Sequence, residues 1–143
     1  MGRSCVRTCL SLAVGGFNLL ASALPAQAQS PSPSPPEVPA AARALQNPMK
    51  GDGMTIQRGM GVFHKHCVPC HGTTGAGDGP MAQRLGYKPR NLTLERMNQL
   101  TDGEIFWRVS KGFPPMPAFE QELSGRERWD VVSYVRTLVR MIQ

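Results

Sequence analysis

Aromatic residues are scarce in this sequence: tryptophan, tyrosine and phenylalanine together make up 6% of its 143 residues. Hydrophobic residues reach 41%, whereas glycine and proline are frequent, with 15 and 13 copies. Glycine and proline interrupt regular secondary structure, so the composition favours one domain of short helices and loops. The apolar core of such a domain is small, and a flat prosthetic group at its centre would complete it.

The sequence has no apolar run long enough to span a bilayer comfortably. Residues 10–24 are apolar, but glycines and an asparagine interrupt them. Arg3 and Arg7 precede this run, and Ala26-Gln27-Ala28 supplies the small residues that a signal peptidase recognises. We therefore predict a signal peptide over residues 1–28, a periplasmic protein and no stable membrane insertion after cleavage. A retained membrane anchor is the alternative.

Residues 29–51 are rich in proline, alanine and serine. Segments of this composition favour extended polyproline conformations and do not build a core. We expect a disordered leader over residues 29–51, followed by a folded domain over residues 52–143.

The chain carries 16 lysines and arginines against 10 aspartates and glutamates, a net charge of +6. Because Arg3 and Arg7 leave with the signal peptide, the mature chain carries 14 − 10 = +4. A mildly basic surface can steer a protein toward an acidic partner, although solvated helix faces are the preferred explanation of such a charge. The basic residues are scattered among acids and no nucleic-acid-binding motif is present, so nucleic acid is not an expected partner.

After export only two cysteines remain, Cys67 and Cys70, in the sequence Cys67-Val68-Pro69-Cys70-His71. Two nearby thiols in an oxidising compartment would pair unless something consumes them. Two cysteines separated by two residues and followed by a histidine form the pattern of c-type haem attachment. The thiols can add to the two vinyl groups of one porphyrin while His71 reaches the iron. We expect one covalently bound haem c.

Two other readings of this motif remain open. A redox dithiol would require a thioredoxin-like strand and helix, and no strand pattern lies beside the motif. A structural zinc site would require a second, distant pair of ligands, which the chain lacks. Haem is the preferred interpretation.

Met116 is the candidate for the second axial ligand of the iron. Pro115 and Pro117 restrict the backbone on both sides of it, which can hold the thioether rigidly in a loop. His64 and His66 lie within one turn of Cys67 and are read as surface or haem-edge residues. We expect a cavity between His71 and Met116.

Apolar spacing predicts a helix that leads into the motif. Ile56, Met60, Phe63 and Cys67 recur at helical intervals, which places one apolar stripe on a helix that begins near residue 52 or 55. This helix would end at the attachment site.

Capping boxes predict two further helices. Thr101-Asp102-Gly103-Glu104 would begin a helix that ends at Gly112, and Ser124-Gly125-Arg126-Glu127 would begin a helix that runs to the C-terminus. A short helix is expected over residues 80–85, with Gly86 as its stop.

Taken together, these features resemble a class I monohaem cytochrome c of the bacterial periplasmic type, over about Thr55 to Ile142. The features that carry the resemblance are Cys67-Val68-Pro69-Cys70-His71-Gly72, Gly77-Asp78-Gly79-Pro80, Asn91-Leu92-Thr93, Met116-Pro117, and Trp129 with Tyr134 in the last helix. The resemblance implies an all-α, small cytochrome c fold in which helices and loops wrap around one covalently bound haem.

The resemblance also implies roles for individual residues. The first and last helices would cross closely at a contact shared by Gly59, Phe63, Tyr134 and Leu138. The carbonyl of Pro80 would accept a hydrogen bond from His71 and make it a stronger iron ligand. A haem propionate would meet Arg90, Asn91 or Trp107.

The expected function is one-electron transfer without catalysis. Cys67 and Cys70 would hold the haem, His71 and Met116 would ligate its iron, and Lys88, Arg90, Arg108 and Lys111 would form a basic rim. The partners would be redox proteins such as a dehydrogenase, a reductase or a terminal oxidase. Two alternatives are an electron-transfer subunit of a larger complex and a ligand-binding haem protein with an open iron site.

Overall fold

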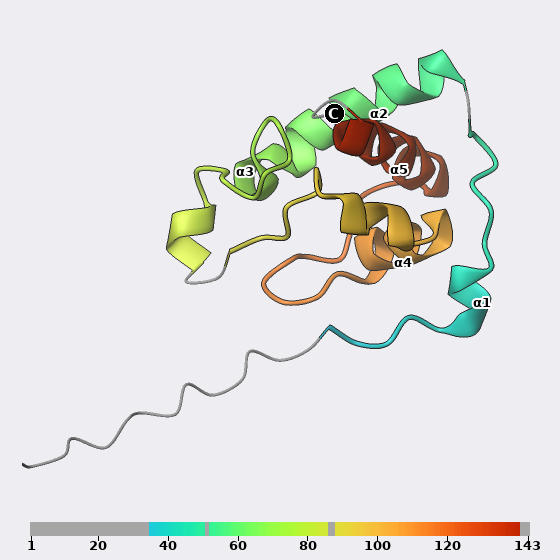
Figure 1. Ribbon diagram of the computed structural model, residues 1–143, viewed down its shortest axis with the longest axis horizontal. Helices are drawn as coiled ribbons and strands as arrows, with labels where there is room; N and C mark the ends of the chain where they lie inside the picture. The colour runs from blue at the N-terminus through green and yellow to red at the C-terminus, as the bar shows by residue number, and fades with distance from the viewer. Residues whose placement is uncertain (1–34, 51, 86–87, 141–143) are drawn as a thin grey trace, which may run out of the picture. The chain divides into compact units, whose positions relative to one another are not determined.

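The computed structural model describes residues 35–50, 52–85 and 88–140 and belongs to the all-α class (Figure 1). Among the described residues, β pairing is limited to an isolated bridge between Phe113 and Met116. The predicted signal peptide, the leader up to residue 34, Gly86 and Ile142 lie outside the described residues. The α-helices are α1 Ala40–Arg43, α2 Gly53–His66, α3 Val68–His71, α4 Asp102–Lys111 and α5 Gly125–Arg140, with 3-10 helices η1 Ala82–Leu85 and η2 Glu95–Gln99.

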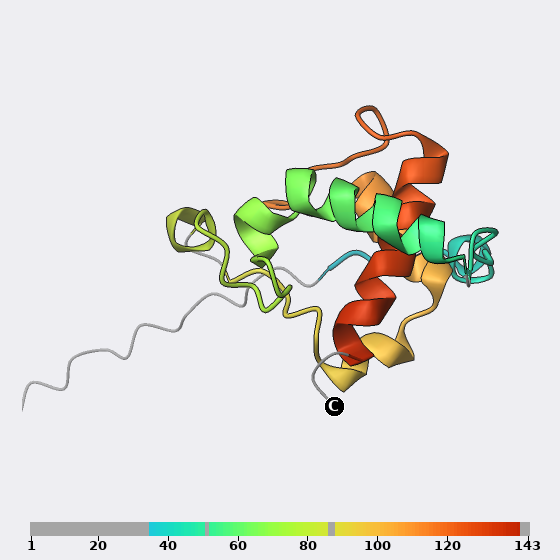
Figure 2. The same cartoon turned by 90° about the horizontal axis from the view of Figure 1, so that it is seen from above.

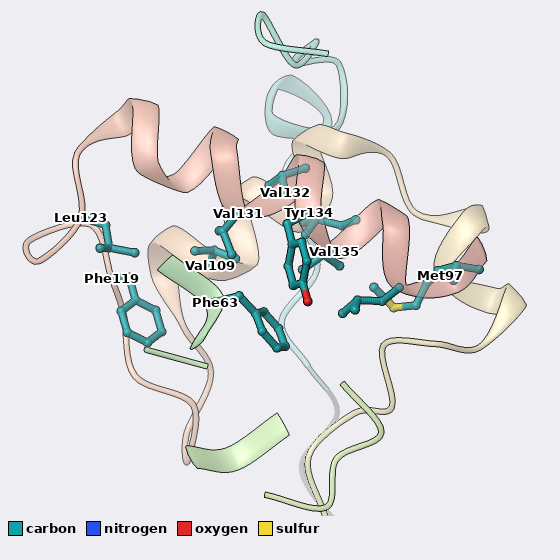
Figure 3. Packing of buried hydrophobic residues seen from close by; sticks show 12 residues of the cluster. Phe63, Met97, Val109, Phe119, Leu123, Val131, Val132, Tyr134 and Val135 are labelled. Carbon is teal, nitrogen blue, oxygen red and sulfur yellow. The ribbon is translucent and has the colours of Figure 1, made fainter. Parts of the chain in front are cut away.

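The helices α2 and α5 cross at close range, as the green and red ribbons of Figure 2 show. Gly59 makes the approach feasible, because a Cβ atom there would clash with the carbonyl of Asp130 and touch the Cβ of Tyr134. Phe63 lies next along the buried stripe of α2, and its ring centroid is 5.2 Å from that of Tyr134 (Figure 3). Leu138 is buried one turn further along α5.

An ion pair fixes the same crossing from one side. The guanidinium of Arg58 donates from Nε to Asp130 Oδ2 at 2.8 Å and from Nη2 to Asp130 Oδ1 at 3.2 Å. The Asp130 side chain is only 2% exposed. A two-point bond of this kind fixes the orientation of both groups as well as their distance.

Both predicted capping boxes are present. At the start of α4, the Glu104 amide donates to Thr101 Oγ1 at 3.1 Å and the Thr101 amide donates to Glu104 Oε2 at 2.7 Å. Ser124 and Glu127 exchange the same two bonds at the start of α5, at 3.2 and 2.9 Å. Each box satisfies amides that the first turn of a helix otherwise leaves without partners.

Arg136 joins α5 to the segment that contains η2 and the start of α4. Its guanidinium donates to Asp102 Oδ1 at 2.7 Å and to the carbonyls of Met97 and Leu100 at 2.7 and 2.5 Å. No sequence pattern predicted η2, which carries the buried side chain of Met97.

Residues 35–50 pack on the helical domain, so the prediction of a disordered leader is wrong for this part. Val38 is 2% exposed and Ala42 is buried. The Asn47 side chain donates from Nδ2 to Ser133 Oγ in α5 at 2.9 Å. The proline content suggested an extended chain without a core, but the residues that receive this segment come from α4 and α5, far along the sequence.

The hydrophobic core lies among α2, α4, α5 and the loop after α4 (Figure 3). Its buried residues are Phe63, Met97, Ile105, Val109, Phe119, Leu123, Val131, Val132, Tyr134, Val135, Leu138 and Val139.

Candidate functional site

Cys67 and Cys70 are one turn apart at the junction of α2 and α3. The helix α2 ends at His66, and the chain turns at once into α3, whose second residue is Pro69. The amides of Cys70 and His71 both donate to the Cys67 carbonyl, at 3.1 and 2.8 Å. This turn places two free, half-buried thiols and an imidazole on one short segment.

The ring of His71 is held by the carbonyl of Arg90, with its Nδ1 3.1 Å from the oxygen. This bond leaves Nε2 as the nitrogen that can bind a metal, and a carbonyl behind Nδ1 makes the ring a stronger ligand.

The expectation that the Pro80 carbonyl accepts this bond is wrong. The loop before Pro80 folds back on α3, because the Gly77 and Gly79 amides donate to the carbonyls of His71 and Cys70 at 2.8 and 3.1 Å. Pro80 is exposed. A different part of the chain reaches His71, since the amide of Leu92 donates to the Gly75 carbonyl at 2.8 Å and brings the segment that contains Arg90 alongside.

Both thiols, His71 and Met116 line one cavity of about 560 Å³. Cofactor pockets commonly have volumes of about 300–1,000 Å³ and mainly apolar walls. The apolar walls of this cavity include Phe63, Leu92, Met97, Leu100, Ile105, Val109, Phe113, Phe119 and Val135. The expected cavity between His71 and Met116 is therefore present.

Met116 reaches the cavity on a loop that is fastened at both ends. Phe113 and Met116 exchange backbone hydrogen bonds of 3.0 and 2.7 Å, and the amide of Phe119 donates to the Val109 carbonyl at 3.1 Å. The Met116 side chain is half-buried. Met81 also lines the cavity, but it is 44% exposed.

Burial sets the protonation of the two residue types that would bind a haem. It raises the pKa of the Cys67 thiol to about 12, with a smaller contribution from Cys70, so this thiol is neutral at physiological pH. Burial also lowers the pKa of His71, although the bond to Arg90 acts in the opposite direction. A neutral imidazole is the form that binds a metal.

Arg108 contributes a buried positive group to the cavity. Its Nε atom is buried and has no hydrogen-bond partner among the described residues. Burial lowers the pKa of Arg108, and the nearby positive charge of Arg90 adds to this effect, but a guanidinium remains charged at neutral pH. Leaving such a donor without a partner costs about 1–3 kcal/mol, so the cavity suits a ligand that carries carboxylates.

The sequence pattern did not indicate Arg108 as a propionate partner. Of the three residues that it did indicate, Arg90 lines the cavity, whereas Asn91 and Trp107 are not among the lining residues. Asn91 instead accepts hydrogen bonds from the amide and hydroxyl of Thr93, at 2.9 and 2.7 Å. One signal was available: Arg108 follows Ile105 at a helical interval and so shares the inward stripe of α4.

His66 lies at the edge of the cavity, and His64 is exposed. His66 Nδ1 is 3.1 Å from Glu122 Oε1, and its ring packs edge-on against Phe119. This contact links the end of α2 to the chain that follows Met116. The described residues contain no group of three or more His, Cys, Asp and Glu side chains placed to hold a metal ion.

The residues of the cavity fit a haem c. Two thiols at the required spacing can form thioether bonds, a neutral imidazole and a thioether sulfur can ligate iron, and the apolar walls suit a porphyrin. The unpartnered donor of Arg108 suits a propionate.

In the described part of the chain, no helix has both the length and the apolar character needed to cross a membrane.

Comparison with known proteins gives the same assignment. Residues 54–135 match the family model described as cytochrome c oxidase, cbb3-type, subunit III. The chain is 31% identical over 80 residues to cytochrome c6 of Synechococcus elongatus, covering 56% of this chain and 86% of that protein. It has the same identity over 80 residues to cytochrome c6 of Thermosynechococcus vestitus, of which it covers 67%.

Two solved structures share the fold. One is a chain of the reducing HAO-like protein complex of Kuenenia stuttgartiensis, with 30% identity and a TM-score of 0.56 over 78% of this chain. The match spans about half, 52%, of that longer chain. The other is the c-type cytochrome KustC0563, with 27% identity, a TM-score of 0.50 and coverage of 56% of this chain and 95% of that one. Because the family model covers more than half of the sequence, this protein belongs to that cytochrome c family and is a monohaem c-type cytochrome.

Proposed function

We propose that Cys67 and Cys70 attach the haem through thioether bonds and that His71 and Met116 are the two axial ligands of its iron. The supporting observation is that all four side chains line one cavity with apolar walls. The family assignment makes the chain a haem c electron carrier. The proposal names the residues that attach the haem and ligate its iron.

The bound haem supplies an iron that gains and loses one electron. His71 is held in orientation by the Arg90 carbonyl, and Met116 is held by the paired backbone of its loop. A methionine sulfur favours the ferrous state and therefore raises the reduction potential. The apolar side chains of Leu92, Val109 and Val135 line the cavity and would keep water away from a bound haem.

Absorption spectra of the ferric and ferrous protein test the axial ligands. Met116→Ala should remove the far-red charge-transfer band of the ferric form and allow carbon monoxide to bind the ferrous form. Met81→Ala is the matched control, because Met81 lines the same cavity but is not a proposed ligand. A wild-type protein that lacks the band and binds carbon monoxide would contradict the proposal and favour a ligand-binding haem protein.

We further propose that residues 1–28 are a cleaved signal peptide and that the mature protein works in the periplasm with redox partners. The mature charge of 14 − 10 = +4 favours an acidic partner surface and a small, transient interface. A mass corresponding to residues 29–143 plus one haem, measured on protein from the periplasmic fraction, would support both parts. A mass that includes residues 1–28 would contradict the cleavage.

A second candidate function is an electron-transfer subunit of a larger oxidoreductase. The supporting observation is that one structural neighbour is a chain of a protein complex. Purification under native conditions separates the two functions, since a free carrier elutes alone and a subunit elutes with a catalytic chain.

A further inference from the structure

Residues 35–47, which we call the N-terminal strap, lie before the segment that matches the family model, residues 54–135. They are nevertheless part of the folded domain. Val38 is almost fully buried and Ala42, in α1, is buried. The helix α1 contacts α4, beside which it lies in Figure 1. The strap therefore lies outside the segment matched by the family model but packs on the surface of the same folded domain.

The helix α4 contains a glycine at the point where the strap crosses it. A Cβ atom at Gly103 would clash with the carbonyl of Ala42 and would lie 3.1 Å from the Cβ of Leu45. Glycine in a helix costs about 1 kcal/mol relative to alanine, so α4 gives up intrinsic stability at a position where the strap needs close approach. The Thr101 hydroxyl also donates to the carbonyl of Arg43, at 2.9 Å.

The strap reaches the haem cavity at Pro35, and its Arg43 lies near a residue that acts on Arg108. Pro35 is one of the residues that line the cavity, so the strap forms part of its wall. Arg43 lies 3.6 Å from Glu104, measured from Nε to Oε1, and Glu104 is the carboxylate that acts on Arg108. Arg43 therefore places a positive charge beside Glu104, and it also lies 3.7 Å from Glu37 of the strap itself, measured from Nη2 to Oε1.

We propose that the N-terminal strap is a cap on the haem cavity that raises the reduction potential of the iron. Pro35 excludes water from the cavity wall, and Arg43 offsets the negative charge of Glu104. Both effects disfavour the ferric state, which carries one more positive charge than the ferrous state. The inference rests on the haem proposed above.

A substitution at Gly103 tests the cap without changing a residue of the cavity. Gly103→Ala improves the helix propensity of α4 but removes the space that the Ala42 carbonyl occupies. Gly61→Ala is the matched control, because Gly61 also lies in a helix and has no atom within 4 Å of an added Cβ. Val38→Ser is a second variant, which weakens the anchor of the strap and leaves α4 intact.

Three measurements are made on the full-length exported protein. A pyridine haemochrome assay first establishes that each variant carries haem, which separates a failure of this inference from a failure of the proposed function. Trypsin digestion then reports release of the strap through cleavage after Arg43 or Lys50. Redox titration reports the reduction potential of the iron.

The variants Gly103→Ala and Val38→Ser should be cleaved faster than the wild type. They should also have a several-fold lower ferrous-to-ferric ratio at a fixed ambient potential, whereas Gly61→Ala should match the wild type in both measurements.

Two results would overturn the inference. One is a released strap with an unchanged potential, which would make the strap a packing element only. The other is a potential that falls while cleavage stays at the wild-type rate, which would mean that the potential does not depend on the position of the strap.

Discussion

At the scale of single residues, the surroundings of each side chain decide its chemistry in the cavity. Both side chains are half-buried, and burial lowers the pKa of each: this favours the neutral form of His71, whereas Arg108 keeps its charge. The difference follows from their intrinsic proton affinities, because an imidazole can lose its proton near neutral pH and a guanidinium cannot. The cavity thus combines a metal-binding group with a fixed positive charge.

Arg108→Gln should lower the reduction potential. Removing a positive charge from the cavity stabilises the ferric state, and we expect an effect of about 1–2 kcal/mol, a factor of roughly 5–30 in the ferrous-to-ferric ratio. Redox titration measures it. Arg108→Lys should have a reduction potential close to that of the wild type, since it keeps the positive charge and loses only the planar set of N–H donors of the guanidinium.

Arg126→Gln is the matched control for Arg108→Gln. Arg126 is exposed and is not among the residues that line the cavity, and its replacement changes the net charge by the same amount. Equal potentials in the two variants would show that Arg108 acts only through net charge and does not bind a propionate.

At the scale of elements, the contact between α2 and α5 holds the attachment site in place. The helix α2 ends one residue before Cys67, and α5 supplies Asp130, Tyr134 and Leu138 to the contact. Leu138 also lies against Gly75 in the loop that follows His71. Movement of α2 against α5 would therefore move the haem-binding segment.

Gly59→Ala should destabilise the protein although alanine favours the helix. The added Cβ would clash with the Asp130 carbonyl, and overpacking of this kind costs about 1–3 kcal/mol. Denaturant unfolding should show a lower midpoint. Gly61→Ala, which has open space around the added atom, should leave stability unchanged or raise it by up to about 1 kcal/mol. A Gly59→Ala midpoint equal to that of Gly61→Ala would show that the crossing has room to relax.

At the scale of the whole molecule, the scarcity of aromatic residues and the size of the cavity have one explanation. The protein side chains leave a space of about 560 Å³ at the site of the thiols. The space is partly open to solvent, so without a ligand its apolar walls would face water. A bound haem would cover these walls and complete the core.

The double variant Cys67→Ser/Cys70→Ser, produced without haem, should lose its cooperative unfolding transition. With the cavity unfilled, we expect retained helical far-ultraviolet circular dichroism and loss of the near-ultraviolet signal that reports fixed packing. Scanning calorimetry beside the holoprotein measures the difference. A sharp transition at the holoprotein temperature would contradict the view that the haem completes the core.

The sequence by itself was sufficient to predict the attachment motif and the starts of α2, α4 and α5. The thioether chemistry requires Cys67, Cys70 and His71 to be close along the chain, and a capping box such as Thr101 with Glu104 is local as well. The sequence also predicted that Met116 faces His71 across a cavity, because prolines restrict its loop. Local interactions of this kind depend on residues that are neighbours in the sequence, so they can be predicted without knowledge of the fold.

The tertiary structure alone decided which distant groups meet. The carbonyl behind His71 belongs to Arg90 and not to Pro80, because two loops pack together beside α3. Arg108 faces the cavity because α4 is oriented by its contact with α5. Residues 35–50 pack on the domain because Gly103 leaves space for the carbonyl of Ala42 and because Ser133 Oγ accepts a hydrogen bond from Asn47. These contacts join residues far apart in the chain, and their energies depend on packing geometry that a sequence pattern does not contain.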